Sequence, residues 1–184
     1  MTELSDQQVL SGAEQSFVLH WGEMGTRWGI NRTVAQVHAL LYVSSEPLPA
    51  EEIARLLEVA RSNVSTSLRE LQNWRLVRVV HRKGDRRDYF ETVHDAWEMF
   101  RIILEERRKR EIEPTVQLLR ECVAGAERDG AAGETTRERL RTLLEAFELA
   151  DGWYAQMRDL PSAIVLRVLR MGGKALRILR LTKS

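Results

Sequence analysis

Apolar residues recur three or four positions apart in two short segments between residues 49 and 73, and this spacing predicts two amphipathic helices. The apolar positions are Ile53, Ala54 and Leu57 in the first segment and Val64, Leu68 and Leu71 in the second. Only residues 58–60 separate the two patterns, so the helices must cross steeply. This geometry is typical of a helix-turn-helix.

The second helix of such a motif is the one that enters a DNA groove. Its outward face carries short polar side chains and guanidinium groups, which can reach base edges and phosphates in a major groove about 12 Å wide. The predicted DNA-contacting residues of this recognition helix are Arg61, Ser62, Asn63, Ser65, Thr66 and Arg69.

Two alternating segments follow, at residues 76–81 and 89–93, and they predict a pair of strands. The hairpin tip between them contains the turn-forming pair Gly84 and Asp85. It also carries four cations, which are Arg82, Lys83, Arg86 and Arg87. A basic hairpin beside a helix-turn-helix is a wing, and we expect its cations to contact phosphates or the minor groove. The alternative is a solvated loop.

The flanking segments are predicted to be helical. A first helix capped by Ser5 or Asp6 should end at the three glycines of residues 22–29, and Asn31 is a good N-cap for the next helix. After the wing, a long helix should begin at His94 or Asp95 and be kinked or restarted at Pro114.

A glycine-containing linker at residues 125–133 should precede a last helix, which Thr135 and Glu138 would cap. The predicted organisation is an N-terminal arm (1–28), a winged helix-turn-helix domain (29–94), a helical dimerisation region (95–160) and a basic tail (161–184). The fold class is therefore mainly α with a small β wing, with helical dimerisation arms at both ends.

The last long helix has apolar residues at alternating steps of three and four, which is the spacing of helices that pack against a partner helix. These residues are Leu140, Leu143, Phe147, Ala150, Tyr154 and Met157. We expect the partner to be the same helix, or the N-terminal arm, of a second subunit. A homodimer would present two recognition helices to a palindromic site in duplex DNA.

Charge and composition narrow the function. Residues 61–87 hold eight Lys or Arg against Glu70 and Asp85, a local net charge of +6, whereas the whole chain has +1. No apolar stretch of about 18 residues and no secretory signal are present, so we expect a cytoplasmic protein. No metal-ligand spacing, phosphate-binding loop or catalytic constellation occurs, which predicts no metal, no cofactor and no enzymatic activity.

The tail beyond Pro161 has a charge of +6 and no acidic residue. Its cations, at steps of three and four, would line one face of a helix, although Gly172 and Gly173 weaken a continuous helix. Such a tail can pack on the acidic body of the dimer, add phosphate contacts or lie on an anionic membrane, and a membrane is the least favoured of the three.

Several motifs along residues 15–120 together resemble winged-helix transcriptional regulators of the MarR superfamily, and in particular its GbsR group. The matching segments are Trp28–Thr33, Leu40–Tyr42, Glu51–Ala54, Asn63–Ser65, Leu68–Leu71, Trp74–Arg78, Trp97–Glu98, Ile102 and Leu104–Arg108. The resemblance implies a sequence-specific transcriptional regulator, which we expect to be a repressor. Glu58 and Ala60 stand where the group has Gly and Ser, so we expect Ser62 or Asn63 to cap the recognition helix instead.

Regulators of this group respond to small molecules, and some sense choline or glycine betaine. Aromatic rings can bind a quaternary ammonium group by cation–π attraction. The candidate pocket residues are Trp21, Trp28, Tyr42, Tyr89 and Trp97, and the alternative is that these rings form hydrophobic core.

Cys122, the one cysteine, is expected to be a buried inert thiol and not a redox sensor. The competing function for the whole chain is a winged-helix adaptor that binds proteins and not DNA.

Overall fold

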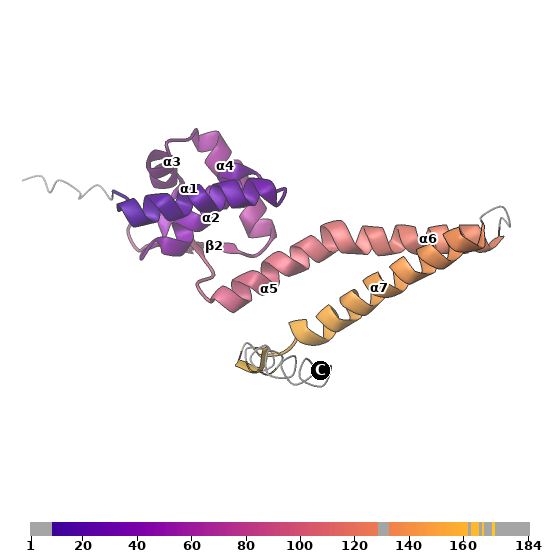
Figure 1. Ribbon diagram of the computed structural model, residues 1–184. Coiled ribbons are helices and arrows are strands. Elements are labelled where there is room, and N and C mark those ends of the chain that lie inside the picture. Colours follow the sequence, from indigo (N-terminus) through magenta and orange to yellow (C-terminus); the bar gives the residue numbers. More distant parts are fainter. Residues whose placement is uncertain (1–8, 129–132, 162, 166, 168–170, 172–184) are drawn as a thin grey trace, which may run out of the picture. The chain divides into compact units, whose positions relative to one another are not determined.

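The computed structural model describes residues 9–128, 133–161, 163–165, 167 and 171. The chain divides into two compact units, Met1–Ile102 and Ile103–Ser184, which we call unit 1 and unit 2. Both units are largely helical, and a small sheet belongs to unit 1 (Figure 1). The predicted fold class, mainly α with a small β wing, is confirmed.

In the described residues of unit 1, four helices precede the wing, namely α1 (Gly12–Arg27), α2 (Arg32–Val43), α3 (Ala50–Leu57) and α4 (Arg61–Asn73). Helix α2 is the centre of the core, because α1, α3, α4 and the sheet all contact it. Every residue from 34 to 41 is consequently buried, as expected for a helix that is surrounded on all sides. The predicted N-cap of α2 is confirmed, since the Asn31 side chain accepts a hydrogen bond from the Thr33 N–H at 2.8 Å.

Helix α1 begins later than predicted. It begins at Gly12, where Ser11 and Glu14 form a capping box, and not at Ser5 or Asp6; residues 1–8 lie outside the described part of the chain. The predicted break lies at the last of the three glycines, because α1 ends at Arg27 and Gly29 follows in the left-handed region with φ of 75°. Gly22 and Gly25 are instead buried within α1. These glycines allow α1 to lie close to α2, and a Cβ atom added at Gly25 would lie 2.5 Å from the Cβ of Ala35.

The sheet has three antiparallel strands in the order β1-β3-β2, where β1 is Leu48–Pro49, β2 is Val77–His81 and β3 is Asp88–Thr92. Strands β2 and β3 form the predicted hairpin, with Val79 opposite Phe90. The third strand, β1, was not predicted, because its two residues directly precede α3 and include a proline. Sequence patterns seldom indicate so short a strand.

Unit 2 is built from the end of α5 (Ala96–Arg107), the π-helix η1 (Arg108–Ile112), α6 (Glu113–Arg128) and α7 (Glu134–Arg158). As predicted, α5 begins after Asp95, whose carboxylate accepts hydrogen bonds from the N–H groups of Trp97 and Glu98. Pro114 was predicted to kink or restart the helix, but the helical path continues without a gap from α5 through η1 into α6. Pro114 directly follows the change from π-helix to α-helix at Glu113.

Helices α6 and α7 pack together and separate with distance from their connection (Figure 1). Two ion pairs link them, Arg120 to Glu148 at 2.8 Å and Arg141 to Glu127 at 2.7 Å. The predicted linker begins later than expected because α6 continues through Gly125 to Arg128, and residues 129–132 lie outside the described part of the chain. The expected Thr135 cap is wrong because Gly133 is the N-cap of α7.

Expectations for the basic tail fall mostly on residues outside the described part of the chain. Within the described residues, no helix is both long enough and apolar enough to cross a bilayer, and no group of His, Cys, Asp or Glu is arranged to hold a metal ion. Cys122 is exposed on α6, so the expectation of a buried thiol is wrong.

Candidate nucleic-acid interface

Helices α3 and α4 are joined by the tight turn that the sequence indicated. Glu58 adopts a left-handed conformation with φ of 53°, and the N–H of Val59 donates to the carbonyl of Ala54. This conformation is unusual for a residue with a Cβ atom and costs roughly 1 kcal/mol. The chain therefore makes the turn without the glycine that would favour it.

Helix α4 begins without a side-chain cap. Ala60 is the N-cap and provides no side-chain hydrogen bond, so the expectation that Ser62 or Asn63 caps the helix is wrong. All six predicted contact residues of α4 are exposed, whereas Val64, Leu68 and Leu71 are buried against the body of unit 1. The amphipathic period thus separates a packing face from an outward polar face.

The two arginines on the outward face of α4 have different surroundings. Arg61, at the start of the helix, forms an ion pair with Glu51 of α3 at 2.6 Å. Arg69, two turns later, is exposed and has no ion pair with any described residue. An arginine without a competing carboxylate retains its full capacity to bind a phosphate or the edge of a guanine.

Two cations of the wing, Arg82 and Arg87, form ion pairs within unit 1. The backbone N–H and guanidinium of Arg87 and the hydroxyl of Tyr89 all donate to the carboxylate of Asp85. These hydrogen bonds keep the pKa of Asp85 well below its usual value. Arg82 lies over the ring of Tyr89, 4.5 Å from its centroid, and its guanidinium donates to Glu46 at 2.8 Å.

The other two wing cations, Lys83 and Arg86, are exposed at the hairpin tip. Neither takes part in an ion pair within the described part of the chain. Gly84 lies between them in the left-handed region, with φ of 86°, and permits the tight turn. The network around Asp85 therefore orders the wing while Lys83 and Arg86 remain available to an anionic partner.

The five rings expected around an effector do not form one group. Trp21 and Trp28 contact each other edge to face at 6.3 Å, and Tyr42 joins them through Phe17 and His38, with centroid separations of 5.4 to 6.5 Å. At such distances the rings pack directly on one another. The two remaining rings lie elsewhere in unit 1, Tyr89 in the wing beneath Arg82 and Trp97 against Phe100 of α5.

Some features of the interface were not found from the sequence. The Asp85 network has a recognisable pattern, an acid two residues before an arginine and four before a tyrosine in a hairpin. The ion pairs of Arg61 with Glu51 and of Arg82 with Glu46 have no recognisable sequence pattern, because the two residues of each pair lie in different elements. Sequence reasoning therefore treated the four wing cations as equivalent, whereas the structure distinguishes two with an ion pair, Arg82 and Arg87, from two without one among the described residues.

Residues 28–88 match the model of the MarR family. That region contains α2, α3, α4 and most of the wing. The chain is also similar to YvaV of Bacillus subtilis, named as a candidate helix-turn-helix transcriptional regulator, with 24% identity over 92 residues. This match covers 50% of the chain and 52% of the relative, so the chain spans about half the length of that protein.

A solved structure shows the same fold. It is a crystal structure of a transcriptional regulator, and it aligns with 79% of this chain and 95% of its own length, with a TM-score of 0.59 and 22% identity. A mutant of Staphylococcus aureus MepR bound to an oligodeoxyribonucleotide aligns with 75% of this chain and 91% of its own, with 16% identity and a TM-score of 0.38. Residues 28–88 therefore resemble the MarR family, the solved structure shows a shared fold, and the GbsR assignment stays a prediction.

Proposed function

We propose that this protein is a sequence-specific DNA-binding regulator of transcription that acts as a homodimer on a palindromic operator, as a repressor. The observation that carries the proposal is the pairing of two surfaces in unit 1. The outward face of α4 is polar and exposed, and the neighbouring wing has uncommitted cations at its tip. In a winged helix these surfaces are the ones that contact bases and phosphates. The match to the MarR family is consistent with this proposal.

The decisive experiment is selection of bound sites from random duplexes by the purified chain. We expect the selected sequences to contain an inverted repeat whose half-sites are one helical turn apart, because a symmetric dimer reads symmetric DNA. Selected sites with a single conserved half-site would retain the DNA function and contradict the dimer. Failure to enrich any sequence, together with no salt-dependent duplex binding, would instead favour the adaptor alternative.

The variants Arg69→Ala and Lys83→Ala/Arg86→Ala separate base contacts from phosphate contacts. Arg69→Ala should reduce the preference for the selected site by about 1–3 kcal/mol, while affinity for random duplexes changes little. The double wing variant should weaken binding to all duplexes and reduce the slope of log affinity against log salt by about 0.9 for each phosphate that is no longer neutralised. Both quantities can be measured by fluorescence anisotropy across a salt series.

Arg139→Ala is the matched control, because Arg139 is an exposed arginine on α7, outside unit 1. Its affinity and salt slope should equal those of the wild type. If the wing variant also retained the wild-type slope, the wing would not contact phosphates.

An effector is a second part of the proposal, and the ring cluster of Trp21, Trp28 and Tyr42 is its candidate site. A quaternary ammonium ligand would have to separate rings that are in contact, so its binding should change tryptophan fluorescence. Titration with choline tests this, and an unchanged spectrum at millimolar choline would remove the proposal. A regulator of this kind would act in the cytoplasm.

A further inference from the structure

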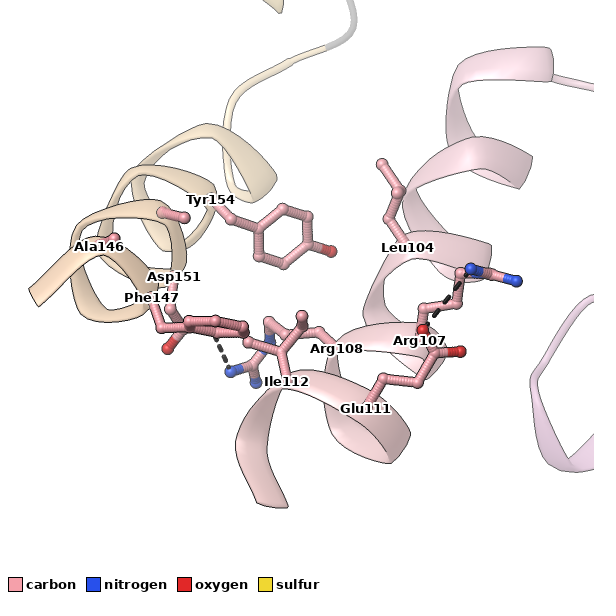
Figure 2. Close-up of a pocket in the computed structure, with 10 residues that line it drawn as sticks. Leu104, Arg107, Arg108, Glu111, Ile112, Ala146, Phe147, Asp151 and Tyr154 are labelled. Atoms are coloured by element: carbon pink, nitrogen blue, oxygen red, sulfur yellow. Dashed lines mark hydrogen bonds and ion pairs between the residues drawn. The ribbon is translucent and has the colours of Figure 1, made fainter. Parts of the chain in front are cut away.

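Unit 2 contains a cavity of about 480 Å³ between α7 and the segment formed by the end of α5 and η1 (Figure 2). Its volume lies in the range of about 300–1,000 Å³ that small-molecule sites occupy. The lining residues are Leu104, Arg107, Arg108, Glu111 and Ile112 on one side and Ala146, Phe147, Ala150, Asp151 and Tyr154 on the other.

The walls of this cavity are apolar and aromatic. The ring of Tyr154 points from α7 toward Leu104, and the ring of Phe147 points toward Ile112 (Figure 2). Leu104 remains 51% exposed although it faces another helix of its own unit. Apolar surface left uncovered in a concave site indicates that something apolar binds there.

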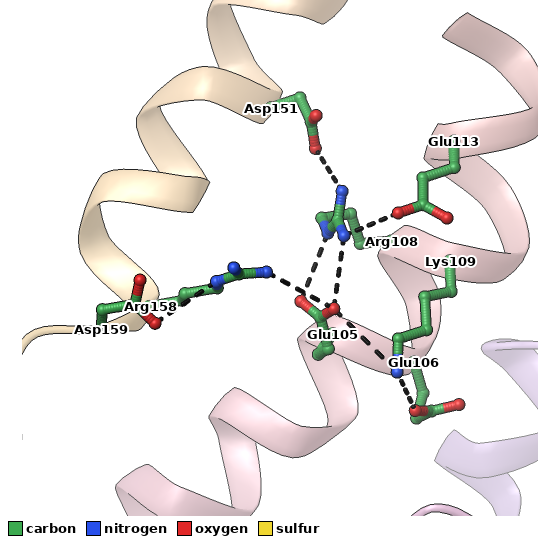
Figure 3. A network of polar contacts seen from close by, with 8 residues as sticks. All are labelled: Glu105, Glu106, Arg108, Lys109, Glu113, Asp151, Arg158 and Asp159. Carbon is green, nitrogen blue, oxygen red and sulfur yellow. Dashed lines mark hydrogen bonds and ion pairs between the residues drawn. The ribbon is translucent and has the colours of Figure 1, made fainter. Parts of the chain in front are cut away.

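The charged groups at the rim neutralise one another. Arg108 donates to Asp151 at 3.1 Å across the cavity and forms ion pairs with Glu105 and Glu113 on its own side (Figure 3). Arg107 forms an ion pair with Glu111 at 3.6 Å. A charged ligand would have to break one of these pairs and leave a partly buried charge without its partner, which is costly. The charge pattern therefore favours an uncharged ligand.

Ion pairs also limit the size of the occupant. Arg108–Asp151 and Arg158–Glu105, the latter at 3.8 Å, both cross from the α5–η1 segment to α7 (Figure 3). A helix from a second copy of the chain would have to break these cross-links, whereas a small molecule would not.

The backbone of one wall is irregular at this position. Residues 108–112 form a π-helix, and this segment supplies Arg108, Glu111 and Ile112 to the lining. A π-helical turn is less stable than an α-helical one and is frequently found at functional sites. Here it places the arginine of the rim and an apolar wall residue on the same side of the cavity.

We propose that this cavity is a binding site for an uncharged aromatic small molecule, held between the rings of Phe147 and Tyr154 and the apolar wall of Leu104 and Ile112. The site lies wholly in unit 2 and shares no residue with the candidate DNA interface or the ring cluster of unit 1. Binding at this site does not depend on the proposed DNA function.

The test uses the full chain and two fluorescent probes that differ by one charged group. N-phenylnaphthylamine is neutral and aromatic, and anilinonaphthalene sulfonate is its anionic counterpart. We expect saturable binding of the neutral probe, with the anionic probe about tenfold weaker because it disturbs the paired charges. Ala150→Leu should reduce affinity for the neutral probe by about tenfold or more, because the larger side chain fills the cavity from α7.

Ala155→Leu is the matched control, since it makes the same change at an exposed position of α7 outside the lining. A second cavity variant, Ala146→Leu, guards against a folding defect in the first, and circular dichroism should match the wild type for all three variants. Saturable neutral binding that both cavity variants weaken and the control leaves unchanged would support the proposal.

Three results would overturn it. The first is no saturable binding of the neutral probe, and the second is equal binding by wild type and both cavity variants. The third is a cavity variant that changes the oligomeric state measured by sedimentation but leaves the affinity for the neutral probe unchanged. That result would mean that a second copy of the chain occupies the cavity.

Discussion

His38 is a buried residue between two rings of the candidate effector cluster. It lies in α2, is 3% exposed, and packs between the rings of Trp21 and Tyr42 at centroid distances of 6.5 and 6.4 Å. Its Nε2 atom has no hydrogen-bond partner among the described residues. Burial without a polar partner disfavours the imidazolium form and lowers the pKa of His38 to about 4. The side chain is therefore neutral in the folded protein at neutral pH.

This lowered pKa predicts a loss of stability in acid. The folded-state pKa lies below the value of about 6.5 in the unfolded chain, so the stabilisation is complete above pH 6.5 and is lost as pH falls through about 4. Between pH 7.5 and pH 5 the free energy of unfolding should fall by about 2 kcal/mol on account of this residue. Urea denaturation at the two pH values measures it, and His38→Leu should remove most of the difference.

His20 is the matched control, because it is an exposed histidine on the neighbouring helix α1. His20→Leu should leave the pH dependence of unfolding as in the wild type. A His38→Leu variant with the full wild-type pH dependence would show that another group titrates.

Single residues of the candidate interface differ in how far the sequence predicts them. The helical period was sufficient to predict that Ser62, Ser65 and Arg69 are exposed, because exposure depends on which face of α4 packs on the core. Periodicity carries no information on the partner of an exposed cation. The pairing of Arg82 with Glu46 arises from the tertiary path that brings β1 beside β3, and only the structure provides it.

At the scale of elements, the contact between α1 and α2 depends on two buried glycines. Gly25 allows the helices to approach so closely that a Cβ there would lie 2.5 Å from the Cβ of Ala35, and real Cβ atoms do not approach so closely. Gly25→Ala should force the two helices apart and lower the free energy of unfolding by about 1–2 kcal/mol, despite the better helix propensity of alanine. Urea denaturation at neutral pH gives the comparison.

Gly12→Ala is the matched control, since it lies in the same helix with no heavy atom within 4 Å of the added Cβ. It should be neutral or slightly stabilising. If both substitutions had the same effect, the close approach at Gly25 would not limit stability.

The main elements of unit 1 were predictable because each has a clear period and a short connection. The two helices of the helix-turn-helix and the two wing strands agree with the sequence patterns at residues 53–71 and 76–93. The glycines of α1 were misassigned because a glycine permits both a chain break and a close helix contact. Which of these occurs depends on the neighbour, here Ala35 of α2, and no local pattern identifies that neighbour.

At the scale of the whole molecule, α7 leaves apolar surface uncovered. Leu149 and Trp153, one helical turn apart, are 77% and 58% exposed. The residues with heptad spacing were expected to contact a second subunit, but Phe147 and Tyr154 among them line the cavity within their own chain. The exposed pair therefore becomes the part of α7 that best fits a subunit contact, since large apolar side chains at a helix surface favour association.

A substitution at this pair tests the proposed dimer and its role in DNA binding together. Burial of a leucine side chain contributes about 1.5–3 kcal/mol, and a symmetric contact buries it twice. Leu149→Asp should therefore raise the dimer dissociation constant by at least about 100-fold, measured by sedimentation equilibrium, while Ala155→Asp on another face of α7 should not. A dissociated chain should retain its affinity for a half-site and lose most of its affinity for the inverted repeat, because only a dimer engages both halves at once. If the Leu149→Asp chain associated as strongly as the wild type, this surface would not be the subunit contact. If the wild type were monomeric in solution and still selected an inverted repeat, DNA binding would not depend on a dimer formed beforehand.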